Sequence, residues 1–92
     1  MCVSASQLPA GDLIEAGLDD LRSGRTSVAA LLVSIGAPKL RRLGYDVRSA
    51  IPEPEHALYA LLAREDQDSA HGRYNALVRR LVSFERAAAC AR

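Results

Sequence analysis

Apolar residues recur at intervals of three and four along most of this chain, which is the spacing of one face of an α-helix. The longest stripe lies in residues 70–92 and consists of Tyr74, Leu77, Val78, Leu81, Phe84 and Ala88. An earlier stripe consists of Leu13, Ile14, Gly17, Leu18 and Leu21. Residues 45–52 contain β-branched residues, but they are too few and too isolated to form a sheet. The pattern predicts an all-α fold.

Glycine and proline divide the first part of the chain into helices. We expect a first helix over residues 9–23, because Pro9 suits a first helical turn and Gly24 can adopt the left-handed conformation that ends a helix. Thr26 offers a side-chain oxygen to cap a second helix over residues 27–35. That segment is apolar on nearly all sides, so it is expected to form the centre of the core.

The remaining breaks predict two or three further helices. Gly36 ends the second helix, and Gly44 ends a short segment that is either a third helix or a continuation of the second after a kink. Another helix is expected over residues 54–65, and Asp68 or Ser69 could cap the last one. We therefore expect a compact bundle of four to five helices with a long C-terminal helix.

The length of 92 residues allows one hydrophobic core, so residues 1–92 are expected to form a single helical domain. We expect residues 1–8 to be flexible and residues 88–92 to be frayed. Large side chains are scarce, with one Phe, three Tyr and no Trp. A core this small often completes itself by pairing, so we expect an oligomer or a complex.

The net charge of +1 hides an uneven distribution of charged residues. Residues 1–22 are acidic, with Asp12, Glu15, Asp19 and Asp20 against Arg22. Residues 69–92 are basic, with Arg73, Arg79, Arg80, Arg86 and Arg92 against Glu85. Such asymmetry can steer an acidic protein or a nucleic acid toward the chain. Because the pI of about 7.8 is below the value usual for a dedicated nucleic-acid domain, nucleic acid is the second choice of partner.

The sequence offers no set of residues that is typical of catalysis or metal binding. His56 and His71 are too far apart for ligand spacing, and the acidic residues Glu65, Asp66 and Asp68 lack the glycine and the distal glutamate of a calcium loop. Ser34 has no neighbouring His and acid, and neither has Ser83. The glycines match neither common phosphate-binding pattern. We therefore expect no enzymatic activity, no metal and no cofactor.

Two cysteines, Cys2 and Cys90, lie near opposite ends of the chain and are interpreted as free thiols. The first residues have no basic region and no apolar run of signal length, and no apolar stretch approaches the length of a membrane span. These features favour a cytoplasmic location and no association with a membrane.

One local pattern is similar to a helix-turn-helix. Residues 27–44 comprise an apolar helix, a glycine turn and a basic second helix, from which Lys39, Arg41 and Arg42 could reach DNA. The second helix would be only about two turns long, and Leu40 and Leu43 must face inward. The same three cations could equally lie on an ordinary solvated surface. A DNA-binding regulator is therefore kept as an alternative.

Two segments carry a family resemblance: LLVSIGAPKLRRLG at residues 31–44, and HALYALLAREDQDSAHGRYNALVRRLVSFERA at residues 56–87. They resemble small bacterial proteins encoded beside nucleotidyltransferase toxins of the AbiEii or MenT type. In that family the small protein is the antitoxin, and the toxin is an enzyme that blocks tRNA by adding nucleotides to it. The resemblance implies a type II antitoxin that neutralises a nucleotidyltransferase toxin by protein-protein contacts.

Exposed charge and side-chain size, rather than the family pattern, suggest where such a partner would bind. Tyr and Arg often dominate protein interfaces, and the last helix is the richest source of aromatic and arginine side chains. The predicted partner-binding residues are Arg73, Tyr74, Leu77, Arg79, Arg80, Leu81 and Phe84. Arg79 and Arg80 are adjacent, so they flank the apolar stripe on different sides. A further alternative is a homodimeric structural subunit that pairs through residues 73–88.

Overall fold

The structure is a computed structural model that describes residues 8–91. Within these residues there are five helices and no strand. The helices are α1 (Gly11–Arg22), α2 (Val28–Ile35), α3 (Ala37–Arg42), α4 (Pro54–Glu65) and α5 (Ala70–Ala91). The predicted all-α bundle with a long C-terminal helix is therefore confirmed.

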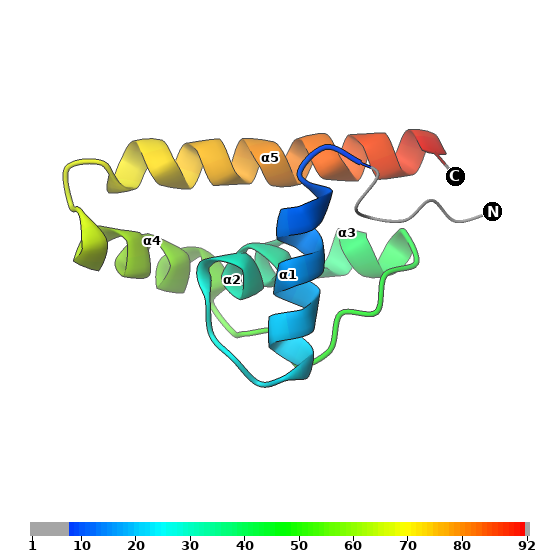
Figure 1. Cartoon of the computed structure of the whole chain (residues 1–92), viewed down its shortest axis with the longest axis horizontal. Helices are drawn as coiled ribbons and strands as arrows, with labels where there is room; N and C mark the ends of the chain where they lie inside the picture. Colours follow the sequence, from blue (N-terminus) through cyan, green and yellow to red (C-terminus); the bar gives the residue numbers. More distant parts are fainter. Residues whose placement is uncertain (1–7, 92) are drawn as a thin grey trace.

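Helix α2 lies at the centre of the bundle, as its apolar sequence predicts. Its residues Ala30, Leu31, Leu32 and Val33 are at most 1% exposed. Helices α1, α4 and α5 all contact α2, and α4 and α5 also contact each other. Figure 1 shows α5 running along one side of the molecule, with α4, α2 and α3 beneath it and α1 across α2. One core thus holds all five helices.

Helix α1 packs on α2 through a glycine. Gly17 is buried, and a Cβ atom at this position would overlap the carbonyl oxygen of Ala29 and the Cγ2 atom of Val33. Helix α1 begins two residues later than predicted, because Pro9 lies in a turn and Ala10 has a left-handed φ of 61°. Gly24 follows with the expected positive φ of 75°.

The cap of α2 corrects a sequence prediction, because the capping residue is Ser27 and not Thr26. Ser27 has an extended backbone, and its Oγ accepts the Ala30 N–H at 3.0 Å. The same hydroxyl donates to Oδ2 of Asp20 at 2.6 Å. This bond and the Arg25 guanidinium lower the pKa of Asp20 against the opposing effect of its partial burial. The hydroxyl of Ser27 therefore both caps α2 and links its start to α1.

Gly36 alone separates α2 from α3, so α3 is a helix of its own rather than a continuation of α2. The absence of a side chain matters here, since a Cβ atom at Gly36 would lie 2.9 Å from Cδ1 of Leu81 and 3.0 Å from Oε2 of Glu85. Helix α5 can therefore approach this junction closely. Gly44, with a φ of 100°, follows the end of α3.

The segment between α3 and α4 is a loop, as predicted, and polar contacts fix it to the bundle. The buried Ser34 hydroxyl donates to the Ala30 carbonyl at 2.8 Å and accepts the Ile51 N–H at 3.0 Å. The Arg41 guanidinium donates twice to the Val47 carbonyl, at 3.2 and 3.0 Å. The Ser34 hydroxyl and the Arg41 guanidinium, which were considered above for catalysis and for DNA binding, thus both form hydrogen bonds within the fold.

Helix α4 has the predicted bounds of residues 54–65. The connector to α5 is fixed by Asp66, whose Oδ1 accepts the Asp68 N–H and whose carbonyl lies 3.4 Å from the Ser69 hydroxyl. Helix α5 has 22 residues and is therefore about 33 Å long. It continues to Ala91, and Ala88 is buried against the core. The expected fraying of residues 88–92 stays a prediction. The sequence also predicts flexibility for residues 1–8. All of these residues except Leu8 lie outside the described residues.

Candidate functional site

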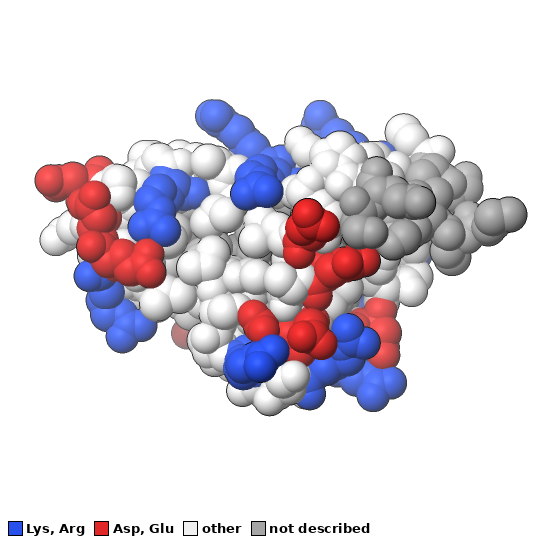
Figure 2. Space-filling view, in the orientation of Figure 1, with Lys and Arg blue, Asp and Glu red and all other residues white. Residues whose placement is uncertain are grey.

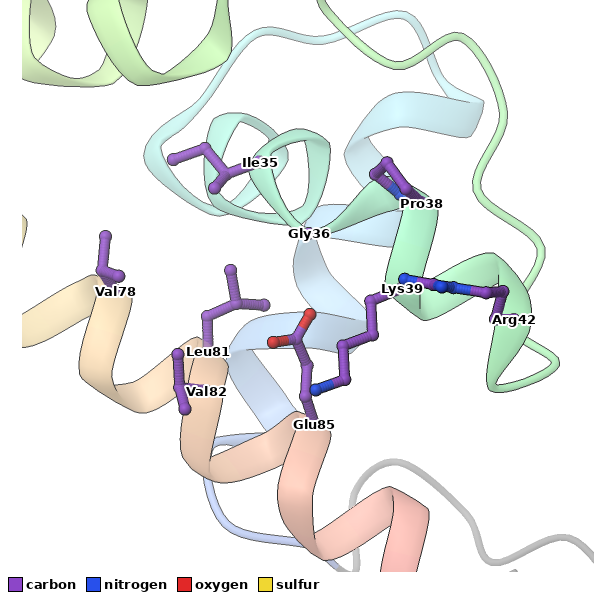
Figure 3. A pocket seen from close by; sticks show the side chains of 9 residues that line it. All are labelled: Ile35, Gly36, Pro38, Lys39, Arg42, Val78, Leu81, Val82 and Glu85. Carbon is purple, nitrogen blue, oxygen red and sulfur yellow. The ribbon is translucent and has the colours of Figure 1, made fainter.

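A groove of about 290 Å³ lies between α5 and the junction of α2 with α3. Its apolar surface comes from Ile35 and Pro38 on one side and from Val78, Leu81 and Val82 on the other. Figure 3 shows Leu81 extending from α5 toward Gly36, with Val78 on the same helix and Ile35 across from it. The volume is at the lower limit of small-molecule pockets, so the groove suits a few side chains better than a large ligand.

Helical spacing explains how α5 builds its wall of the groove. Val78, Val82 and Glu85 are separated by four and three residues and therefore lie on one face of the helix. Gly36 on the opposite wall has no side chain and lets this face come close. The groove thus depends on a glycine and a helix face that are more than forty positions apart in the sequence.

Glu85 is the one acidic residue that lines the groove, and only 6% of its surface is exposed. Burial raises the pKa of the Glu85 carboxyl, and the positive charge of Lys39 partly opposes that rise. In Figure 3 the Lys39 side chain extends from α3 toward the Glu85 carboxyl. Neither histidine lines the groove.

An aromatic cluster lies at the other end of α5, beside α4. The Tyr59 ring is 5.7 Å from the Tyr74 ring and 6.5 Å from the His71 ring, measured between centroids. Tyr59 is 40% exposed, and it is the most exposed large apolar side chain among residues 8–91. Because Tyr74, Val78 and Val82 follow one another at four-residue spacing, an apolar strip joins this cluster to the groove. We call these three residues the α5 strip.

The outer surface of α5 is basic. Arg79, Arg80 and Arg86 are exposed, and within residues 8–91 none of them forms an ion pair. Arg73 differs, because its Nη1 lies 3.0 Å from Oε1 of Glu65. In Figure 2 the side chains that project along the edge occupied by α5 are blue, with no red ones among them. The basic character predicted for this part of the sequence therefore lies on an accessible face.

The structure places two residues of the predicted partner-binding set in the core. Phe84 is fully buried, with its ring centroid 5.5 Å from that of Tyr45, and Leu81 is 3% exposed. Both side chains belong to the core, so a partner could reach them only if α5 moved. A homodimer that pairs through Leu81 and Phe84 would likewise require α5 to move away from the bundle. Tyr74 and Leu77 are half-buried, and Arg73, Arg79 and Arg80 are exposed, so their role in partner binding stays a prediction.

The three cations of the helix-turn-helix alternative all interact within the chain. Arg41 donates to the Val47 carbonyl, and Arg42 also has an intramolecular interaction. The positive charge of Lys39 partly opposes the rise in the pKa of the Glu85 carboxyl that burial causes. The turn between α2 and α3 is a single residue, shorter than the three or four residues usual in that motif. These features disfavour α3 as a recognition helix, although DNA binding itself stays a prediction.

The other residues with possible chemistry lie apart from one another. His71 contacts Asn75, with 3.2 Å between Nε2 and Nδ2, while His56 and Ser83 are exposed. Cys90 is an exposed free thiol, and Cys2 lies outside the described residues. Among residues 8–91, no three His, Cys, Asp or Glu side chains gather in a way that could hold a metal ion. None of the described helices combines the length and apolar character needed to span a bilayer.

The predicted partner-binding set lacks several residues of this surface, among them Tyr59, Val82 and Glu85. A signal was available for Glu85, because it follows Val78 by seven residues and Leu81 by four. A charged residue on the apolar side of a helix indicates either a buried charge or a binding site. No comparable signal was available for Tyr59, whose proximity to Tyr74 depends on the packing of α4 on α5.

Comparison of the chain with known protein families, curated proteins and solved structures gives no match.

Proposed function

We propose that this protein is a binding module without chemistry of its own, and more narrowly that it is the antitoxin of a nucleotidyltransferase toxin. The wider statement is supported by the surface of α5, and the narrower one by the family resemblance of residues 31–44 and 56–87. In this proposal the chain binds its toxin in a fixed ratio and covers part of the toxin surface or its active-site cleft.

The observation that carries the proposal is the uncovered side of α5. The strip of Tyr74, Val78 and Val82 is half-buried, ends in a groove, and is flanked by arginines with no ion pair within residues 8–91. Aromatic and arginine side chains around an apolar centre are the composition typical of protein interfaces. An acid-base or metal-dependent enzyme would need convergent polar groups, and the charged groups that line the groove are one carboxyl, one amine and one guanidinium.

Co-expression with the product of the neighbouring gene tests the proposal. A tagged copy of the full chain is purified after co-expression, and the mass of the eluted material is determined. A stable complex with a nucleotidyltransferase, together with restored growth of cells that express that enzyme, would support the antitoxin function. A chain that elutes alone and gives no protection would contradict it, and a salt-dependent DNA-binding titration would then test the alternative.

A further inference from the structure

We propose that the α5 strip and its groove bind an acidic amphipathic helix of a partner protein, with apolar side chains in the groove and carboxylates at its rim. This inference rests on the proposed binding function and adds the chemistry of the occupant. It does not depend on the partner being a toxin.

The shape of the apolar surface favours a helical occupant. Tyr74, Val78 and Val82 lie on one face of α5 at four-residue spacing, so the strip is about 12 Å long. Ile35 and Pro38 form the facing wall at one end, and the exposed ring of Tyr59 flanks the other. An amphipathic helix laid along such a surface inserts side chains at three- and four-residue intervals. About two turns of a partner helix would match the strip.

The charges at the rim favour an acidic occupant. Lys39 and Arg42 line the groove on the α3 side. On α5, Arg79 precedes Val82 by three residues and Arg86 follows it by four, so both lie beside the strip. Glu85 is the one carboxyl that lines the groove, and it lies within reach of the Lys39 charge. Lys39 and Arg42 already interact within the chain, whereas Arg79 and Arg86 form no ion pair within residues 8–91, so carboxylates at the flanks of a partner helix would complement these two arginines.

Glu85 limits where the partner's own charges can lie. Its carboxyl is almost fully buried and lies against Gly36. A second carboxylate placed in the groove would be repelled by Glu85 and would lose its hydration. The occupant must therefore insert apolar side chains and keep its acidic groups at the rim. This requirement distinguishes an amphipathic helix from a uniformly acidic segment.

Among its described helices, a second copy of this chain offers no acidic helix with a free apolar face, because the partly exposed α5 strip is flanked by arginines that the basic rim would repel. Helix α1 has an acidic outer face, but its apolar face is buried on α2 through Ile14, Gly17 and Leu21. Helix α4 likewise buries Leu58 and Leu62. Neither helix has a free apolar face to place in the groove of another copy, so the occupant is expected to come from a different protein.

Nuclear magnetic resonance titration of the full chain tests the surface directly. The probe is a short synthetic helical peptide with leucines on one face and glutamates at the flanks, and the matched control peptide has lysines in place of the glutamates. We expect the acidic peptide to shift the amide signals of Ile35, Val78 and Val82, and the basic peptide to leave them unchanged. Equal binding of both peptides, shifts confined to other residues, or no binding of either would overturn the inference.

Two arginine variants make the test specific. The double variant R79E/R86E reverses the charges beside the strip, and R80E makes the same change on the opposite flank of α5. Because exposed ion pairs contribute little individually, we expect the double variant to weaken peptide binding by about tenfold. R80E should change it less than about twofold. All three arginines are exposed, so the fold should persist, as circular dichroism would check. An equal effect of R80E would overturn the assignment to this side of α5.

The co-expression experiment separates the two proposals. If the wild-type chain binds no neighbour but still binds the acidic peptide, the antitoxin function fails and the surface assignment stands. If a complex forms that R79E/R86E does not weaken, and the acidic peptide does not bind, the surface assignment fails and the antitoxin function stands.

Discussion

Substitution of Gly17 by Ala tests the packing that holds α1 on the bundle. The added Cβ would overlap the Ala29 carbonyl oxygen and the Cγ2 atom of Val33, and it would lie 2.8 Å from the carbonyl carbon of Ala29. The Val33 side chain can rotate, but a backbone carbonyl in a helix cannot. Helix α1 must therefore move away from α2, which would loosen the contacts of Ile14 and Leu21.

Two opposing effects determine the magnitude. Overpacking of a tightly packed site costs about 1–3 kcal/mol, and the upper end applies because the backbone must move. Alanine is favoured over glycine in a helix by about 1 kcal/mol. The expected net loss in the free energy of unfolding is thus about 2 kcal/mol, which corresponds to a fall in Tm of about 8–16 °C for a domain of this size.

Gly72 provides the matched control. It is also a helical glycine, but nothing lies within 4 Å of a Cβ placed on it. Gly72→Ala should therefore stabilise the chain by about 0.5 kcal/mol through helix propensity alone. Urea unfolding followed by circular dichroism measures both variants. A Gly17→Ala variant as stable as the wild type, with an unchanged urea dependence, would refute the close approach of α1 and α2.

Three further predictions concern single side chains. Ser27→Ala removes the cap of the Ala30 N–H and should lower the free energy of unfolding by about 1 kcal/mol. Part of that loss comes from the hydrogen bond to Asp20, which lowers the pKa of the Asp20 carboxyl. This part should be present at pH values above the usual aspartate pKa, and it should disappear as the pH falls through the pKa of Asp20 in the folded state. Because the pKa of Glu85 is raised in the fold, the wild type should lose stability as pH rises through the usual glutamate range. Glu85→Gln should not show that loss, and identical pH profiles would contradict the burial of the carboxyl. Phe84→Ala should lower the free energy of unfolding by about 3–5 kcal/mol; unchanged stability of the monomer would instead indicate an interface residue.

Local signals in the sequence determined the helices. The spacing of apolar residues, the prolines and the glycines placed α4 at its observed bounds, and they placed the other helix ends within a few residues, because these signals act on the backbone of their own segment. Gly24 and Gly44 have the positive φ values that their positions after helices predict. The composition of α2 was also sufficient to place it at the centre, since a helix that is apolar on nearly all sides has to be surrounded.

Tertiary packing decided what covers each face, which a helical period cannot specify. Phe84 and Val78 belong to the same stripe of α5, yet Phe84 is fully buried and Val78 lines a groove. The difference arises because six residues place Phe84 about 120° around the helix from Val78, so the bundle covers the first side chain and leaves the second at its edge. The burial of Glu85 likewise depends on the approach of Gly36 from a distant part of the chain. The sequence by itself therefore determined which segments are helices and which of their faces are apolar, whereas the contacts among the helices decided which parts of those faces stay available to a partner.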